Sequence, residues 1–317
     1  MKSRHLVDKE LVAMLDAFPP MTFSAETLAD ARGFMKAMGE AAVPPPLPVE
    51  AERRMIPGPK GAPEVPVHIY RPKGAKGPLP AYLDIHGGGY IGGTPLMGDV
   101  RNRTLAHELQ CVIVSVDYRV APETPFPGPV EDCYAGLLWL HANAKELGAD
   151  PKRIAIGGDS AGGGLAAALA LVARDRGVVP VILQVLIYPM LDDRTSTVRE
   201  DHPYAGEFMW TPASNRYGWT SYLGKAPGGP NTPGHAAPAR AANLAGLPPA
   251  FIAVGALDLF IDEDIEYAQR LIRAGVPTEL HVYPGAFHGF DLVPDATSTK
   301  AIQASMRTAL KRAFTGA

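Results

Sequence analysis

The chain has 317 residues, of which 46% are hydrophobic and 20% charged, a balance that is typical of globular proteins and excludes an intrinsically disordered chain. Its 33 Gly and 32 Pro residues follow no Gly-X-Y period, so a collagen-like fibre is excluded and they are expected in turns and close backbone approaches. The net charge of −3, without any basic run, provides no general attraction to nucleic acid or to an anionic membrane.

The sequence predicts neither a membrane span nor a secretion signal. Its longest apolar stretch, residues 165–173, is far shorter than the roughly 18 residues that a membrane helix needs. The N-terminal segment becomes charged again at Asp8, which leaves no apolar core for a signal peptide. Cys111 and Cys133 lie in apolar segments, so we expect two buried free thiols and a cytoplasmic location.

The first part of the chain is predicted to be helical and then to change to strands. Residues 1–43 carry apolar side chains at helical spacing, and Pro19-Pro20 divides them into two helices. The proline-rich residues 43–48 cannot be helical and are expected to form an extended connector. Three strands are predicted next, the first of them at a sheet edge: residues 67–70, 81–85 and 111–116.

Helices and strands alternate through the rest of the chain. The spacing of apolar residues predicts helices at residues 130–148, 161–176, 262–274 and 302–313. Short apolar runs predict strands at residues 153–156, 181–187, 251–254 and 279–283. This alternation predicts the α/β class, with a mostly parallel central sheet flanked by helices on both faces.

One long segment interrupts the alternation. Residues 191–242 contain aromatic, Gly and Pro residues without a strand pattern, and they are far longer than an ordinary connection between a strand and a helix. We interpret them, together with residues 1–43, as a helical cap on a catalytic domain formed by residues 44–190 and 243–317. The cap is expected to cover the carboxyl edge of the sheet, where open α/β folds bind their ligands.

Ser160 is the strongest candidate for a nucleophile. It lies in Gly158-Asp159-Ser160-Ala161-Gly162, between a predicted strand and a predicted helix, which is the context of a nucleophile elbow. The glycines allow the sharp turn, and the helix N-terminus favours a developing anion beside Ser160. The segment has neither the Gly-Lys-Ser/Thr ending of a phosphate-binding loop nor the glycine spacing of a dinucleotide site.

A second glycine-rich motif directly follows the predicted strand 81–85. In His86-Gly87-Gly88-Gly89, three successive glycines expose backbone N–H groups, a pattern described for the oxyanion holes of lipases and esterases. His86 itself is interpreted as a residue that orients this loop rather than as a base.

The base is predicted to be His288, one of nine histidines. It follows the last predicted strand, where a side chain reaches the carboxyl edge of the sheet, and it comes last in the order serine, acid, histidine. Seven others lie near the terminus, inside predicted strands or helices, or in the cap: His5, His68, His107, His141, His202, His235 and His281.

The acid is predicted to be Asp258, which ends a strand between Ser160 and His288. Asp192 and Asp193 also follow a strand and remain its rivals. Asp262 and Asp264 are interpreted as N-cap and first-turn residues of the next helix.

With these residues the chain resembles the α/β-hydrolase superfamily, specifically its hormone-sensitive-lipase-like group of bacterial esterases. The resemblance spans roughly residues 55–317 and rests on His86-Gly87-Gly88-Gly89, on residues 117–123 (DYRVAPE) and on the Ser160 motif. Asp258 and His288-Gly289-Phe290 continue it, although Leu259 stands where the family's acid segment has Pro. The resemblance implies that the N–H groups of Gly88, Gly89 and Ala161 form the oxyanion hole.

The resemblance implies a serine carboxylesterase that works through an acyl-enzyme, without a metal or organic cofactor, on small ester substrates with short-to-medium acyl or aryl groups. An amidase or peptidase with the same machinery remains an alternative, as does a non-catalytic small-ligand receptor, although such receptors typically lack the histidine. A homodimer is a further expectation from the resemblance. An apolar substrate cleft is predicted from seven residues: Tyr90, Tyr188, Phe208, Met209, Trp210, Leu259 and Phe287.

Overall fold

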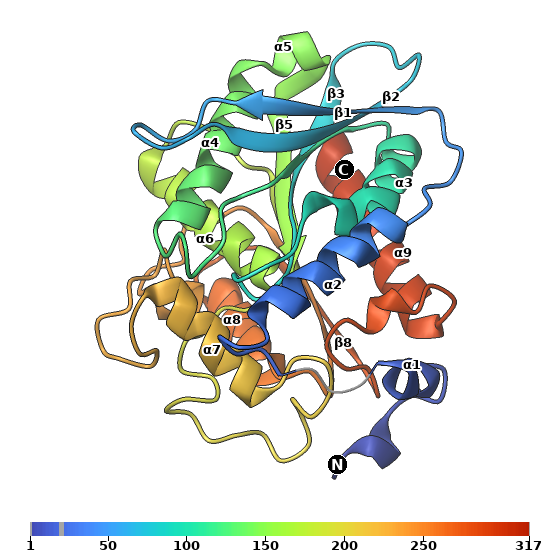
Figure 1. Ribbon diagram of the computed structural model, residues 1–317. Coiled ribbons are helices and arrows are strands. Elements are labelled where there is room, and N and C mark those ends of the chain that lie inside the picture. The colour runs from blue at the N-terminus through green and yellow to red at the C-terminus, as the bar shows by residue number, and fades with distance from the viewer. Residues whose placement is uncertain (1, 19–21, 317) are drawn as a thin grey trace.

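The computed structural model describes residues 2–18 and 22–316, and one twisted sheet runs through its centre (Figure 1). Eight strands of the described residues lie in the order β1-β2-β4-β3-β5-β6-β7-β8. Strands β4, β3 and β5 to β8 are parallel, while β2 is antiparallel to both β1 and β4. Their bounds are β1 Val49–Ile56, β2 Val65–Pro72, β3 Leu79–Ile85, β4 Val112–Val116, β5 Ala149–Asp159, β6 Leu183–Ile187, β7 Ala250–Gly255 and β8 Thr278–Tyr283.

Helices cover both faces of the sheet, which confirms the predicted α/β class. Helices α4 and α6 lie together on one side and α3 and α9 on the other (Figure 1), and one apolar core fills each side. The helices are α1 Val12–Ala17, α2 Leu28–Ala41, α3 Asp99–Leu109, α4 Gly128–Ala142, α5 Ala144–Leu147, α6 Ala161–Arg176, α7 Pro212–Leu223, α8 Ile261–Arg273 and α9 Thr297–Thr315.

The prediction of an edge strand at residues 67–70 is wrong, because β2 is covered on its outer side by β1. The sequence pattern missed β1, whose buried residues Val49 and Ile56 enclose a run of mostly exposed, mostly charged positions. A strand at the margin of a sheet faces solvent over much of its surface, and charged side chains there protect the edge from pairing with other chains. Such a strand lacks the apolar alternation by which sequence analysis recognises strands.

Several other bounds differ from those predicted. The helix expected over residues 130–148 is interrupted at Asn143, where α4 ends and α5 begins. Cys111 and Cys133 are buried free thiols, as predicted. In the described part of the chain, no helix has both the length and the apolar character to cross a membrane.

The N-terminal helix α2 is held by Arg32 against the loops that follow β3 and β4. Its guanidinium donates to the carbonyl oxygens of Ile91 at 2.6 Å and Ala121 at 2.9 Å, and it forms an ion pair with Glu123 at 2.7 Å. This pairing lowers the pKa of Glu123 to about 2. The predicted division at Pro19-Pro20 lies outside the described residues.

The segment 191–242 contains α7 and a short 3-10 turn, Pro238–Arg240. It meets the N-terminal segment where the backbone N–H of Phe23 donates to Ser214 Oγ at 3.1 Å. Figure 1 shows α2 crossing the middle of the view, with α7 below and to the left of it. The division of the chain into cap and catalytic domain stays a prediction.

Helix α8 departs from its predicted N-terminus, because Phe260 and not an aspartate occupies the N-cap. Asp262 and Asp264 both lie in the first turn, and Asp264 is fully buried. Neither carboxylate oxygen of Asp264 has a hydrogen-bond partner among the described residues. Burial, followed by the negative charges of Glu263 and Asp258, raises the pKa of Asp264 well above its ordinary value.

We expect Asp264→Asn to stabilise the fold near neutral pH. A raised pKa in the folded state means that folding favours the protonated carboxyl of Asp264. The contribution of this group to the stability of the fold is therefore fully present in acid, and it is lost as the pH rises from the pKa of the unfolded chain through that of the folded protein. Removing the charge should therefore raise the free energy of unfolding by about 1–2 kcal/mol at pH 7 and by less at pH 4. Urea unfolding at both pH values checks this, with the exposed Asp262→Asn as control; equal effects at pH 4 and 7 would contradict it.

Candidate active site

Ser160 lies at the turn between β5 and α6, in a strained backbone conformation. Its φ of 56° and ψ of −123° lie in a region that residues other than glycine rarely occupy. The turn packs closely against the end of β3, since a Cβ on Gly158 would lie 2.2 Å from the Ile85 carbonyl oxygen. The sequence therefore needs glycine beside the serine, and the turn presents Ser160 Oγ at the start of α6.

The structure brings Ser160, His288 and Asp258 together in one line of hydrogen bonds. The distance from His288 Nε2 to Ser160 Oγ is 2.9 Å, and His288 Nδ1 lies 2.8 Å from Asp258 Oδ2. Ser160 is 6% exposed, His288 9% and Asp258 0%. The second carboxylate oxygen of Asp258 accepts the backbone N–H of Phe260 at 2.9 Å, so both of its oxygens are held.

Aromatic rings confine the imidazole of His288. The rings of Tyr188 and Phe260 meet it edge-on, with centroids at 4.8 and 5.3 Å. Tyr188 is in turn fixed by a hydrogen bond of 2.6 Å from its hydroxyl to Asp291 Oδ1. The ring of His288 therefore has little freedom to leave the position between Ser160 and Asp258.

The loop of Gly88 and Gly89 lies beside the serine with its N–H groups available. Both glycines have positive φ, 126° and 63°, which avoids the strain that a side chain would bring. In the described residues, the backbone N–H groups of these glycines donate to no protein group, and that of Ala161 is an unpaired first N–H of α6. Backbone donors of this kind suit the stabilisation of an oxyanion.

His86 begins this loop and contacts the residues around it. Its Nδ1 lies 2.8 Å from the Gly87 carbonyl oxygen, and its ring stacks on Tyr118 at 4.2 Å. Tyr118 also donates from its hydroxyl to the His86 carbonyl oxygen at 2.8 Å. Burial is the main cause that lowers the pKa of His86, which favours the neutral ring suited to a structural role.

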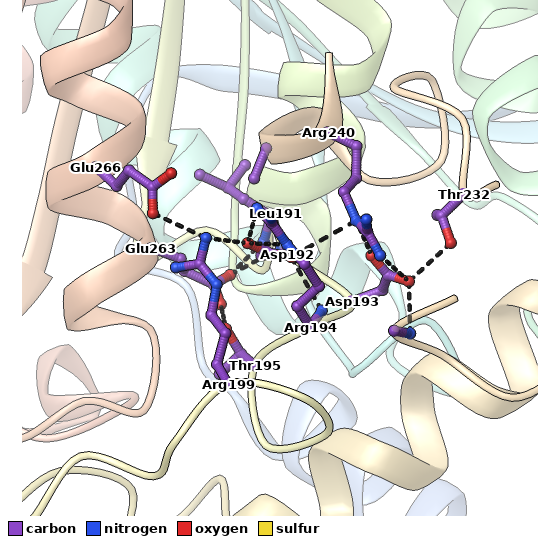
Figure 2. A network of polar contacts seen from close by, with 12 residues as sticks. Leu191, Asp192, Asp193, Arg194, Thr195, Arg199, Thr232, Arg240, Glu263 and Glu266 are labelled. Atoms are coloured by element: carbon purple, nitrogen blue, oxygen red, sulfur yellow. Dashed lines mark hydrogen bonds and ion pairs between the residues drawn. The ribbon is translucent and has the colours of Figure 1, made fainter. Parts of the chain in front are cut away.

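The rival acids Asp192 and Asp193 belong to a separate polar network (Figure 2). Asp192 pairs with Arg194 at 2.8 Å, while Asp193 pairs with Arg240 and accepts from Thr232 Oγ1 at 2.8 Å. Burial alone would raise the pKa of Asp192, but the hydrogen bonds from Arg194 outweigh it and lower the pKa. Neither carboxylate contacts His288, so both serve to fix the chain that follows β6.

Glu263 ties the same network to α8 (Figure 2). Its carboxyl group accepts the backbone N–H groups of Leu191 at 2.6 Å and Asp192 at 3.1 Å, together with the hydroxyl of Thr195. Burial and the charge of Asp192 raise its pKa. The helix that follows Asp258 is thus fastened to the segment that follows β6.

Two of the predicted substrate-contact residues, Tyr90 and Phe287, are buried in the packed interior. Tyr90 is 1% exposed and packs in the core, where its ring stacks on Tyr222 at 4.1 Å and its hydroxyl donates to the Met190 carbonyl oxygen at 2.7 Å. Phe287 is fully buried against Phe208, with ring centroids at 5.7 Å.

The indole of Trp210 packs against the loop that contains Gly88 and Gly89. A Cβ on Gly89 would lie 2.2 Å from Cη2 of Trp210, and the Trp210 ring is 6.3 Å from that of His288. Leu259 packs on the backbone of Gly206, where a Cβ would meet Leu259 Cδ1 at 2.4 Å, and Met209 is half-buried beside Trp210 with a φ of 60°.

This fold and this arrangement of side chains define the serine hydrolases of the α/β-hydrolase type. The family model described as alpha/beta hydrolase fold matches residues 82–292, and the chain belongs to this family. It is 38% identical to the carboxylic ester hydrolase LipN of Mycobacterium tuberculosis over 271 residues. This match covers 84% of this chain and 70% of LipN. It is 37% identical to the carboxylesterase NlhH of the same organism over 292 residues. This match covers 90% of this chain and 88% of NlhH.

Solved structures agree with the sequence relatives. A bacterial heroin esterase superimposes with a TM-score of 0.90 at 42% identity, over 98% of each chain. Within the family, the chain is therefore a carboxylic ester hydrolase.

Proposed function

We propose that the chain hydrolyses small esters with short-to-medium acyl or aryl groups through Ser160, His288 and Asp258. The continuous hydrogen bonding from Asp258 through His288 to Ser160 Oγ carries this proposal. His288 takes the proton of Ser160 as Oγ attacks the ester carbonyl, and Asp258 holds the tautomer and stabilises the imidazolium.

The tetrahedral intermediate then needs donors for its oxyanion, and the N–H groups of Gly88, Gly89 and Ala161 supply them. One such donor contributes roughly 3 kcal/mol in comparable sites. Return of the proton from His288 releases the alcohol, and water activated by the same imidazole cleaves the acyl-enzyme. Besides the ester and water, these steps use the side chains of Ser160, His288 and Asp258 and the three backbone N–H groups.

The preference for short acyl groups is supported by the closed surroundings of the serine. Ser160 is only 6% exposed, and the Trp210 indole lies directly over Gly89. Relatives are described as a carboxylesterase and a heroin esterase, and neither name indicates a long-chain lipid. A cytoplasmic location and a homodimer, for instance through the exposed edge at β8, stay predictions.

A series of p-nitrophenyl esters from C2 to C12 tests the substrate class. We expect the highest kcat/KM at or below about C8. Each methylene that the acyl site cannot hold gains no favourable contact and meets steric resistance. A maximum above C10 would contradict the proposal, and the matching anilide of the best ester would report amide hydrolysis.

We expect Trp210→Ala to move the preference towards longer acyl chains. Removing the indole opens space beside Gly89, so the ratio of kcat/KM for C8 to C2 esters should rise by about tenfold. Trp139→Ala on α4 is the matched control, since Trp139 lies under Arg54 and away from the oxyanion loop. An unchanged chain-length profile in a folded Trp210→Ala enzyme would show that the indole does not limit the acyl site.

A further inference from the structure

A single guanidinium joins the strands that lead into the oxyanion loop and the nucleophile elbow. Arg101 on α3 donates from one terminal nitrogen to Asp84 Oδ1 at 2.9 Å and to Asp159 Oδ1 at 3.0 Å, and from the other to Asp159 Oδ1 at 3.1 Å. Asp84 lies on β3 two residues before His86, and Asp159 directly precedes Ser160. Each carboxylate therefore belongs to a segment that carries one part of the site.

Asp84 is a buried charge that needs this cation. It is 1% exposed and lies opposite Ser115 of β4 and Gly157 of β5 in the sheet. Its other oxygen accepts from Asn102 Nδ2 at 2.8 Å and Ser115 Oγ at 2.7 Å. Both of these donors are neutral, so Arg101 supplies the positive charge that a buried carboxylate requires.

Asp159 carries the constraint to the oxyanion loop itself. Its Oδ2 lies 2.8 Å from the position that a Cβ on Gly87 would take, so the carboxylate held by Arg101 rests against the first glycine of that loop. A displacement of Asp159 would move both Ser160 and the neighbouring loop. The distance between the nucleophile and its oxyanion donors thus depends on one side chain from α3.

The same guanidinium faces the residues that support His288. Besides Asp84 and Asp159, the groups around it are Asp291 and the hydroxyls of Tyr82 and Tyr188. Tyr188 contacts the His288 ring and donates to Asp291. Burial raises the pKa of Asp291, and the charge of Arg101 opposes this rise.

We propose that Arg101 is a positioning residue for ester hydrolysis: it sets the separation between Ser160 Oγ and the oxyanion donors, and it offsets the carboxylate charge beneath His288. The inference rests on the proposed roles of Ser160 and His288. The geometric role of Arg101 should affect kcat, and the role of its charge should affect the pH profile. A residue that only contributes to folding would not produce both effects.

The test compares Arg101→Met and Arg101→Lys with Arg103→Met. Arg103 lies on the same helix and pairs with Asp99 at 2.8 Å, away from both loops, and its variant should keep kcat within about twofold. Arg101→Met should lower kcat for p-nitrophenyl butyrate by about 10²-fold, with KM changed by less than about threefold, because the reacting groups are displaced. Arg101→Lys keeps the positive charge but loses the forked geometry of the guanidinium. Its kcat should therefore lie between that of the parent enzyme and that of Arg101→Met.

The pH profile supplies a readout that a purely structural role would not move. Without Arg101, the uncompensated carboxylates favour the imidazolium form, so the acid limb of kcat/KM should move to higher pH by about one pH unit in Arg101→Met. Asp159→Asn removes a negative charge, and its acid limb should move to lower pH although kcat also falls. Arg101→Lys should keep the acid limb of the parent enzyme.

Folded variants with the parent kcat, or acid limbs that coincide in Arg101→Met and Asp159→Asn, would overturn the proposal. If circular dichroism shows that Arg101→Met does not fold, Arg101→Lys and Asp159→Asn carry the same test. Fluorophosphonate labelling of Ser160 should slow in Arg101→Met but remain measurable. Absence of labelling in the parent enzyme would contradict the proposed function itself, which keeps the two failures apart.

Discussion

Replacing Ser160 by alanine is expected to lower kcat for a p-nitrophenyl ester by about 10⁴–10⁶-fold, the loss typical of a removed triad nucleophile. Without Oγ, the hydrogen bond of 2.9 Å to His288 Nε2 is absent, and no acyl-enzyme forms. The activity that remains would come from the oxyanion donors and from binding of the ester. Steady-state kinetics at saturating substrate measure this directly.

The control for this variant is Ser221→Ala on α7, which removes another nearly buried serine without touching His288. It should retain kcat and react with a fluorophosphonate, whereas Ser160→Ala should not become labelled. Activity of Ser160→Ala within about tenfold of the parent enzyme would exclude Ser160 as the nucleophile.

The second large effect is expected for Asp258→Asn, which should lower kcat by about 10⁴-fold near neutral pH. The carboxylate accepts a hydrogen bond from His288 Nδ1–H, with an Nδ1 to Oδ2 distance of 2.8 Å, which leaves Nε2 free to take the proton of Ser160. An amide that donates to Nδ1 would favour the opposite tautomer, with the hydrogen on Nε2, and an imidazolium would no longer face a negative charge.

Asp193→Asn is the matched control, since Asp193 was a rival for the same role and lies 2.7 Å from Arg240. We expect it to destabilise the segment after β6, because Arg240 loses its partner, but to leave kcat of the folded enzyme within a few-fold of the parent. Melting temperature and kcat measured on both variants separate the effects. A larger loss of kcat in Asp193→Asn than in Asp258→Asn would reverse the assignment.

Local sequence patterns were enough to predict several parts of the molecule. Helix 161–176 was predicted with the bounds that α6 has, because its start is marked by the turn at Ser160 and its end by Gly177. The order of serine, acid and histidine favoured His288 as the base and left Asp258, Asp192 and Asp193 as possible acids, of which Asp258 was preferred; the structure brings His288 and Asp258 to Ser160. Their catalytic roles stay predictions.

Other features depend on contacts between segments that are distant in the sequence, and these required the folded structure. The edge strand β1 carries mostly charged residues between its buried ends, and its place is settled by pairing with β2 rather than by its own pattern. Tyr90 directly follows Gly89, yet its ring packs in the core against Tyr222. A side chain's direction depends on the elements that pack around it, which adjacency in the sequence does not encode.

Arg101 illustrates the same limit for charge. Nothing in its local sequence distinguishes it from Arg103, two residues further along the same helix. The fold places one guanidinium between Asp84 and Asp159 and the other beside Asp99. Spacing within the chain identified the groups proposed to react, whereas their supports became visible only when the sheet brought segments from different parts of the chain together.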